Sequence, residues 1–107
     1  REVPVTWDET RLIEGNPGEY VALARRNGDT WYIAAINAVE ETKEYNVWEM
    51  VDDISKYMKP AKDSVVRIYE GGNEPVIRTV PSGDLYKTDI KVAKNDGVIV
   101  VIKAEKK

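Results

Sequence analysis

Carboxylates are the side chains of this sequence best suited to chemistry, because 19 of its 107 residues are Asp or Glu. Two neighbouring carboxylates can divide the roles of general acid and base, and Asp8–Glu9 and Asp52–Asp53 are the pairs considered for this. Adjacent residues of an extended strand point to opposite faces, however, and acidic residues at a helix start stabilise the helix through its dipole. Both pairs therefore favour solvated or capping carboxylates, and we assign no catalytic residue to this chain.

A metal site is the second chemistry that carboxylates can support. Glu49, Asp52 and Asp53 lie close together in the sequence, but they lack the glycine-punctuated spacing of a calcium-binding loop. The chain also has no Cys and no His, so the usual zinc, iron–sulfur, Cys–His and Ser–His sites cannot be built from it. We therefore expect neither a metal nor a cofactor in this domain.

The aromatic residues suggest binding rather than catalysis. The chain has three Trp and six Tyr but no Phe, and rings with a polar atom suit both protein interfaces and stacking on the flat faces of sugars. Trp31 lies in the most apolar segment and is assigned to the core. Trp7 and Trp48 have charged neighbours, and for them a core position and a sugar contact both remain open.

The stretch ALARRNGDTWYI, residues 22–33, places two arginines beside a turn. Asn27 and Gly28 both tolerate positive φ, which predicts a hairpin closed by a type I′ turn. Arginines at adjacent strand positions alternate faces, so only one of them can share a face with a given ring. We expect a structural role here, such as Arg26 stacked across the hairpin on an aromatic ring, Tyr20 or Trp31, rather than a ligand clamp.

The charge distribution argues against a nucleic-acid partner. Sixteen basic and 19 acidic residues give a net charge of −3, and the basic residues are spread along the chain. No apolar run approaches the roughly 18 residues of a transmembrane helix, and no signal peptide opens the chain, so no membrane partner is expected. Because the chain begins with Arg1, we expect a piece of a longer polypeptide, with any targeting signal upstream.

Short runs rich in Val, Ile, Thr and aromatic residues alternate with turn signals, a pattern typical of an all-β protein. The predicted fold is an antiparallel β-sandwich or Greek-key barrel of about eight strands, forming a single domain over residues 1–107. The predicted strands cover residues 5–13, 19–27, 30–39, 44–48, 64–70, 75–80, 86–94 and 97–104.

One segment departs from the strand pattern. Near residues 51–58 four apolar residues recur at helical spacing, which predicts a short helix with Asp52 or Asp53 as its N-cap and Pro60 as its end. A disordered loop is the alternative interpretation of this segment.

The strand patterns also predict the layers. Segment 30–39 is apolar in both alternating sets, and segment 97–104 is similar, so both should be central strands covered on two sides. Segment 86–94 alternates lysines with apolar residues and should be half-exposed. Two sheets, each with one solvated outer face, are the expected architecture.

The first third of the chain resembles the C-terminal domain of glycoside hydrolase family 97. Five short motifs of that domain occur in the same order and at close spacing over residues 3–37. These motifs are Trp7-Asp8-Glu9-Thr10, Gly18-Glu19-Tyr20, Ala24-Arg25-Arg26, Gly28-Asp29 and Trp31-Tyr32. From Val39 onward only the strand pattern is shared, so the second half supports the fold and not the family.

The resemblance implies a bacterial, periplasmic enzyme that degrades polysaccharides at α-glucosidic or α-galactosidic bonds. Such an enzyme has a β-rich N-terminal domain, a catalytic (β/α) barrel and this β-sandwich at its C-terminus. The paired carboxylates and the bound calcium ion of the family are implied in the other two domains, so none of them is assigned to residues of this chain.

Our leading hypothesis is a non-catalytic accessory domain that packs against the catalytic barrel of its own polypeptide and supports homo-oligomerisation. Trp7 is the predicted anchor of the interdomain interface, with Asp8, Glu9 and Arg11 as its polar rim. The alternative is a carbohydrate-binding module that uses Trp7 and Trp48.

Overall fold

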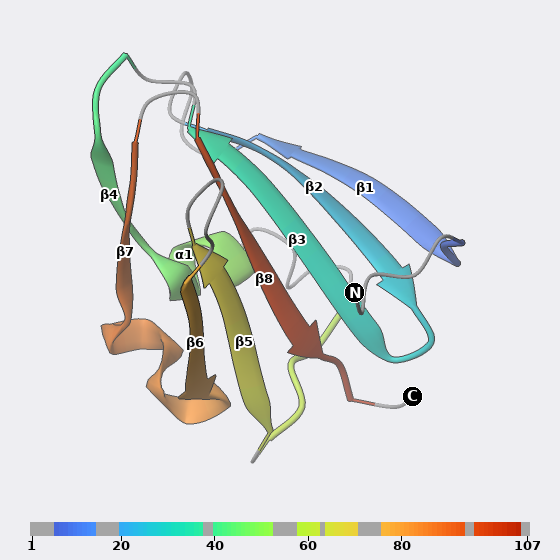
Figure 1. The fold of residues 1–107 in the computed structure, drawn as a ribbon. Coiled ribbons are helices and arrows are strands. Elements are labelled where there is room, and N and C mark those ends of the chain that lie inside the picture. The colour runs from blue at the N-terminus through green and yellow to red at the C-terminus, as the bar shows by residue number, and fades with distance from the viewer. Residues whose placement is uncertain are drawn as a thin grey trace.

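The protein is a two-layer antiparallel β-sandwich, described here by a computed structural model for residues 6–14, 20–37, 40–52, 58–62, 64–70, 76–93 and 96–105 (Figure 1). The larger layer is a six-stranded sheet in the order β1-β2-β3-β8-β5-β6, and the smaller layer is the pair β4–β7. The strands are β1 (Glu9–Glu14), β2 (Tyr20–Asn27), β3 (Thr30–Asn37), β4 (Lys43–Asn46), β5 (Val65–Glu70), β6 (Val76–Pro81), β7 (Asp89–Val92) and β8 (Gly97–Lys103).

This architecture confirms the predicted all-β sandwich and its eight strands. The six-stranded sheet ends at β1 on one side and β6 on the other, so the described strands form no closed barrel. Residues of the predicted turns at 15–18, 71–73 and 95 lie outside the described part of the chain.

The β2–β3 hairpin forms as predicted, but its turn lies one residue later. Asn27 pairs with Thr30, so the two-residue loop is Gly28–Asp29 rather than Asn27–Gly28. Gly28 has φ of 62°, a left-handed conformation that glycine adopts without strain. The Gly28 N–H donates to Asp8 Oδ2 at 2.7 Å, which fixes the turn against the segment that enters β1.

The core lies between the inner face of the six-stranded sheet and the smaller layer. Along each strand alternate residues point inward, and the register aligns Ala24, Ile33, Val100 and Ile68 in one buried row across four strands. Trp31 is 1% exposed, which confirms its assignment to the core. The opposite wall of the core includes the buried side chains of Tyr45, Val47, Met50, Val51, Leu85, Ile90 and Val92.

A buried polar residue joins the two layers. Asn37, at the end of β3, donates from Nδ2 to the carbonyl oxygens of Val92 and Glu41, both at 2.9 Å. Its Oδ1 accepts a hydrogen bond of 2.9 Å from the Tyr45 hydroxyl. These bonds tie β3 to β7 and to β4, so the amide sets how the smaller layer sits on the sheet.

The predicted helix exists, but it begins earlier than expected. Helix α1 spans Val47–Asp52 rather than a segment near 51–58. Asn46 is the N-cap, since its Oδ1 accepts from the Glu49 N–H at 3.3 Å, a role the prediction gave to Asp52 or Asp53. Residues 47, 50 and 51 supply the buried helical face. The rest of the predicted helix, residues 53–57, lies outside the described residues.

The strand predicted over 86–94 is also shorter than expected. A 3₁₀ helix, η1 (Ser82–Lys87), occupies its start, and β7 begins only at Asp89. Thr88 closes η1, because its N–H donates to the Leu85 carbonyl at 3.1 Å and its hydroxyl to the Asp84 carbonyl at 2.8 Å. Within β7 the predicted alternation is confirmed, with Ile90 and Val92 buried and the intervening residues exposed.

The second face of the six-stranded sheet, here called the outer face, differs from the prediction. Ile36 is 58% exposed and Ala34 is exposed, so β3 is covered on one side only. In β8, Val101 is buried on the outer face and Ile99 is half-buried, which agrees better with a strand covered on both sides. The β4–β7 pair has the expected hydrophilic outer side, whereas the six-stranded sheet presents apolar residues. A strand that is apolar on both faces can thus be covered on both sides, but the described residues of this chain cover only one side of β3.

Candidate interaction surface

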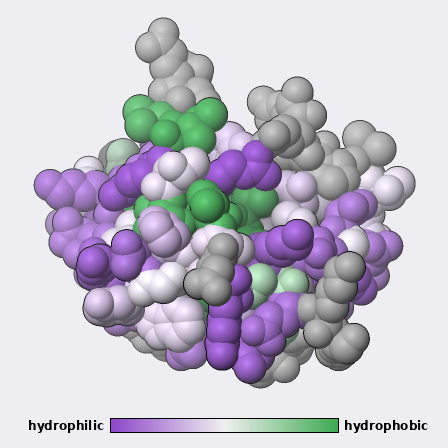
Figure 2. All heavy atoms as spheres, turned by 90° about the horizontal axis from the view of Figure 1, so that it is seen from below, coloured by the Kyte–Doolittle hydropathy of each residue, from purple (hydrophilic) through white to green (hydrophobic). Residues whose placement is uncertain are grey.

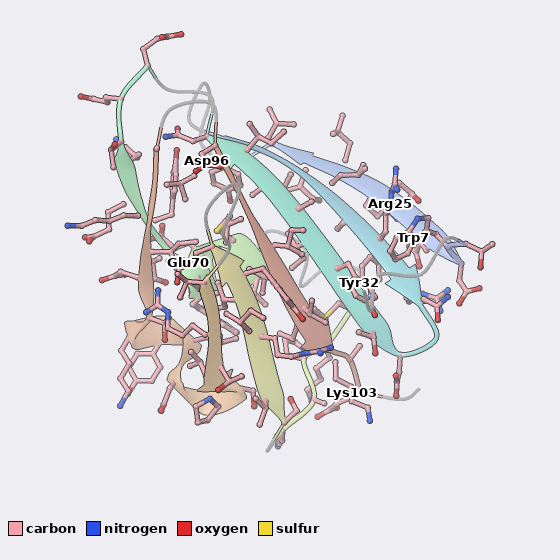
Figure 3. The ribbon with its side chains drawn as sticks, viewed as in Figure 1. Trp7, Arg25, Tyr32, Glu70, Asp96 and Lys103 are labelled. Atoms are coloured by element: carbon pink, nitrogen blue, oxygen red, sulfur yellow. The ribbon has the colours of Figure 1, made fainter. Side chains whose placement is uncertain are left out.

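Trp7, the predicted anchor, lies on the outer face of the β1–β2–β3 part of the sheet (Figure 3). Its ring meets the edge of the Tyr32 ring, with centroids 5.3 Å apart and planes at 67°. The Arg25 guanidinium lies over the Trp7 ring, its Cζ 5.5 Å from the ring centroid. Trp7 is therefore engaged inside the domain, and its half-buried ring extends the outer face beyond the strands.

The polar residues beside Trp7 are also engaged within the domain. Asp8 accepts from the Gly28 N–H, and its carboxylate lies 3.7 Å from the Arg26 guanidinium. Glu9 accepts from the Nε of Arg11 at 2.7 Å and from the Nε of Arg26 at 3.3 Å. The hydrogen bond from Arg11, with a smaller contribution from Arg26, holds the pKa of Glu9 below its usual value.

These contacts change the interpretation of the arginine pair. Arg25 and Arg26 do alternate faces, but the arginine that stacks is Arg25, on Trp7, rather than Arg26 on Tyr20 or Trp31. Arg26 instead donates to Glu9 and, at 2.8 Å, to the carbonyl oxygen of Gly28. Strand β1 forces this outcome, because it places Glu9 directly opposite Arg26. The interdomain role of Trp7, Asp8, Glu9 and Arg11 stays a prediction.

Trp48, the other predicted sugar contact, belongs to the smaller layer. It lies on α1 and is 39% exposed, whereas the neighbours that turn inward, Val47 and Met50, are buried. Tyr86 on η1 is also exposed, and Asn46, which caps α1, donates to the Tyr86 carbonyl at 2.9 Å. Trp7 and Trp48 thus come from opposite layers of the sandwich and do not form one platform.

Among the described residues no group of three or more Asp, Glu, His or Cys side chains could hold a metal ion. Asp52 and Glu49 are exposed on α1, and Asp53 lies outside the described residues. Within the same residues, no helix combines the length and the apolar character that crossing a membrane requires.

The outer face of the sheet is apolar as well as the inner face, but it is open to solvent at several positions. One row of outward-facing residues, here called the central row, crosses all six strands with five apolar side chains and one tyrosine. Its members are Leu12, Leu23, Ala34, Ile99, Tyr69 and Ile77. Leu12 is 68% exposed and Ile77 is 59% exposed, so both ends of the row are open to solvent.

Two further rows flank the central row. On one side Val21 and Ile36, which are exposed, pair across β2 and β3. On the other side lies a row that we call the arginine row, Thr10, Arg25, Tyr32, Val101, Arg67 and Thr79. The sequence prediction missed this surface, although the second apolar alternation of segments 30–39 and 97–104 was its signal.

The view from below shows how the polar and apolar side chains are distributed. Hydrophilic residues cover most of that side, while hydrophobic residues gather near its centre and in one projecting group (Figure 2). On that side the exposed apolar side chains are thus localised, as expected for sites of contact.

A sandwich with an exposed apolar sheet face, and with its candidate polar residues engaged in its own turns, defines an interaction domain rather than a catalytic one. Comparison with known proteins agrees. The family described as "Glycosyl-hydrolase 97 C-terminal, oligomerisation" matches residues 6–103, and the chain belongs to this family. It is therefore the C-terminal oligomerisation domain of a family 97 glycoside hydrolase, as the resemblance of the first third had indicated.

Curated relatives match the first part of the chain. A retaining alpha-galactosidase of Bacteroides thetaiotaomicron is 49% identical over 35 residues, which are 33% of this chain and 5% of that protein. A probable retaining alpha-galactosidase of Streptomyces bingchenggensis is 50% identical over 32 residues, 30% of this chain and again 5% of that protein. The matched segments are thus small parts of much longer enzymes, whose catalytic residues lie elsewhere.

Solved structures match nearly the whole chain. A crystal structure of a beta-arabinopyranosidase has a TM-score of 0.61 and 32% identity, over 92% of this chain and 15% of that one. A family 97 enzyme from Pseudoalteromonas sp. strain K8, in complex with panose, has a TM-score of 0.53 and 19% identity, over 98% of this chain and 17% of that one. At that identity, the second likeness shows the shared fold.

Proposed function

We propose that this domain stabilises and assembles a bacterial α-glycosidase by packing against the catalytic barrel of the same polypeptide and by supporting a homo-oligomer. The observation that carries the proposal is the exposed apolar outer face of the six-stranded sheet, in a domain whose predicted polar interface residues are used internally. A face of this kind lowers its free energy when a partner removes it from water.

The reaction proposed for the whole enzyme is hydrolysis of α-galactosidic or α-glucosidic bonds in a carbohydrate. The two curated relatives reported above are a retaining alpha-galactosidase and a probable one, which supports the first sugar, whereas the structure with 32% identity is a beta-arabinopyranosidase. Because relatives that share this domain act on different sugars, we infer that the domain does not select the substrate. We place the paired carboxylates and the calcium ion in the other domains, and the enzyme in the periplasm.

Deletion of the domain from the full-length enzyme tests the proposal. We expect removal of residues 6–103 to lower the melting temperature of the remainder. We also expect it to change the oligomeric state, measured by light scattering as the number of protomers per particle. The preference among nitrophenyl α-galactoside, α-glucoside and β-arabinopyranoside should stay the same. An unchanged melting temperature and an unchanged oligomeric state would contradict the proposal. A changed sugar preference would contradict only the inference about substrate selection.

Trp7 provides a sharper test of the predicted anchor. We expect Trp7→Ala in the full-length enzyme to lower thermal stability, because the ring packs on Tyr32 and Arg25 of the outer face. The same substitution in the 107-residue chain measures the part of this loss that comes from contacts inside the domain. The anchor role is wrong if the two losses are equal and the oligomeric state is unchanged.

A carbohydrate-binding role is the second candidate, and the exposed ring of Trp48 on α1 favours it. Titration of the labelled domain with α-gluco- and α-galacto-oligosaccharides, followed by NMR of the three Trp indoles, separates the two functions. Saturable shifts confined to one or two indoles would support sugar binding. A silent titration up to millimolar sugar would leave packing and assembly as the function.

A further inference from the structure

The outer face has a charge pattern that differs from that of the chain as a whole. The central and arginine rows together hold twelve residues, of which two are arginines and none is acidic. The whole chain, in contrast, has more acidic than basic residues and a net charge of −3. These two rows are therefore an apolar stripe bordered on one side by cations, whereas the row on the other side, that of Val21 and Ile36, also includes Glu14.

This pattern selects among the surfaces that could cover the face. A second copy of the two rows would contribute two more arginines and no carboxylate, so pairing of these rows with themselves gains nothing from charge. An apolar surface bordered by Asp or Glu would pair its carboxylates with Arg25 and Arg67. Along these two rows, charge complementarity thus favours a different surface over a second copy.

The path of the chain identifies where that surface comes from. Trp7 precedes β1, and its ring packs on Tyr32 and Arg25, which both belong to the arginine row (Figure 3). Its backbone neighbours hold the same edge, because Asn27 Nδ2 donates to the Thr6 carbonyl at 3.1 Å and the Asp8 N–H donates to the Arg26 carbonyl at 2.7 Å. The segment leading into β1 is thus fixed at the margin of the outer face, so a domain that precedes it in sequence ends near that face.

We propose that the outer face of the six-stranded sheet is the interdomain surface, and that its occupant is the preceding domain of the same polypeptide, through an apolar patch bordered by acidic side chains. This inference rests on the proposed function and names the surface and the chemistry that perform it. Oligomerisation is then left to other surfaces of the domain.

The dimensions of the face suit such a contact. Six strands about 4.8 Å apart span about 24 Å, and three rows about 7 Å apart add about 14 Å in the other direction. A partner seated there would bury about 340 Å² on each side, about 700 Å² in total, at the lower end of the roughly 600–1,500 Å² of interdomain contacts. The exposed ends of the central row, Leu12 and Ile77, would both lie inside this footprint.

The test uses single charge substitutions in the full-length polypeptide. Leu12→Glu and Ile36→Glu change exposed residues of the outer face. Val76→Glu is the matched control, because Val76 is similarly exposed but belongs to the other face of the sheet, on the edge strand β6. Each variant is also made in the 107-residue chain, where a wild-type melting temperature shows that the substitution leaves the fold intact.

Three measurements decide the outcome: calorimetry, limited proteolysis and light scattering. The proposal expects Leu12→Glu and Ile36→Glu to separate the unfolding of this domain from that of the remainder and to raise proteolytic release of the domain by about tenfold or more. The oligomer mass should stay the same, and Val76→Glu should resemble wild type. Loss of the oligomer without release of the domain would overturn the proposal in favour of a second copy.

Failure of this inference is distinguishable from failure of the proposed function. If deletion of residues 6–103 alters the melting temperature and the oligomeric state but the outer-face variants behave as wild type, the domain packs through another surface and the inference is wrong. If the deletion itself has no effect, the proposed function fails as well.

Discussion

Asn37 offers the most direct test of how the two layers of the sandwich are held together. Its side chain is 1% exposed and makes three hydrogen bonds of 2.9 Å, to the carbonyls of Val92 and Glu41 and from the hydroxyl of Tyr45. These bonds connect β3 with the β4–β7 layer. Asn37→Ala removes all three while changing little apolar packing.

The expected cost follows from the number of bonds. A net contribution of about 1 kcal/mol for each buried hydrogen bond gives a loss of about 3 kcal/mol in the free energy of unfolding. For a domain of this size that loss corresponds to a drop of about 12 °C in melting temperature. Tyr45→Phe removes one of the three bonds, and we expect it to cost about 1 kcal/mol.

Urea unfolding of wild type, the two single variants and the double variant measures these values. We expect a coupling energy of about 1 kcal/mol between positions 37 and 45, because the double variant loses their shared bond only once. The reasoning is refuted if Asn37→Ala costs less than about 1 kcal/mol, or if the two substitutions are additive.

Asn37→Asp adds a pH test with a defined sign. The new carboxylate would face two carbonyl oxygens in a buried site, which raises its pKa above that of the unfolded chain. The folded state then binds more protons than the unfolded state, so the stability of the variant relative to wild type falls as the pH rises above about 4. A constant difference between pH 4 and pH 8 would contradict the burial of this amide between carbonyls.

The remaining predictions concern the turn, the sheet and the core. Gly28→Ala should cost about 1 kcal/mol in urea unfolding because φ is 62°, whereas Gly83→Ala, the control with nothing within 4 Å of the added carbon, should change stability by less than about 0.5 kcal/mol. Gly97→Ala should cost more than this control, because the added carbon would lie 3.0 Å from a carbonyl oxygen of β3; equal values would show that the strands adjust freely. Glu9→Gln should cost up to about 1 kcal/mol at pH 7 and nothing at pH 2, because a lowered pKa in the fold stabilises only above the unfolded pKa and is lost as the pH falls; a pH-independent loss would contradict this. Trp31→Phe should cost clearly less than the roughly 3–5 kcal/mol of Trp31→Ala, since the indole N–H is buried without a hydrogen-bond partner in the described structure; similar losses would mean that this donor is satisfied.

Features encoded within a few residues were predictable from the sequence. The hairpin around Gly28 follows from the conformational freedom of glycine between two apolar runs, and the burial of Trp31 follows from its place in the most apolar segment. The motifs of the first third also identified the family that matches residues 6–103. Local errors arose where caps compete, since Asn46 rather than an aspartate begins α1.

The candidate surface was less predictable, because it depends on neighbours that are distant in sequence. Residues 12, 23, 34, 99, 69 and 77 form one row only after six strands have paired in register. The same pairing sends Arg25 to Trp7 and Arg26 to Glu9, which adjacency in the sequence leaves undecided.

The sequence by itself determined the all-β class, the positions of most strands and the absence of cysteine and histidine chemistry, because periodicity, turn residues and composition are local properties. The family was indicated separately, by the resemblance of the motifs in residues 3–37. The tertiary structure decided which apolar faces are covered. Alternation tells that both faces of β3 are apolar, but only the packing of the β4–β7 layer on one side shows that the other side, with Ile36, stays exposed for a partner.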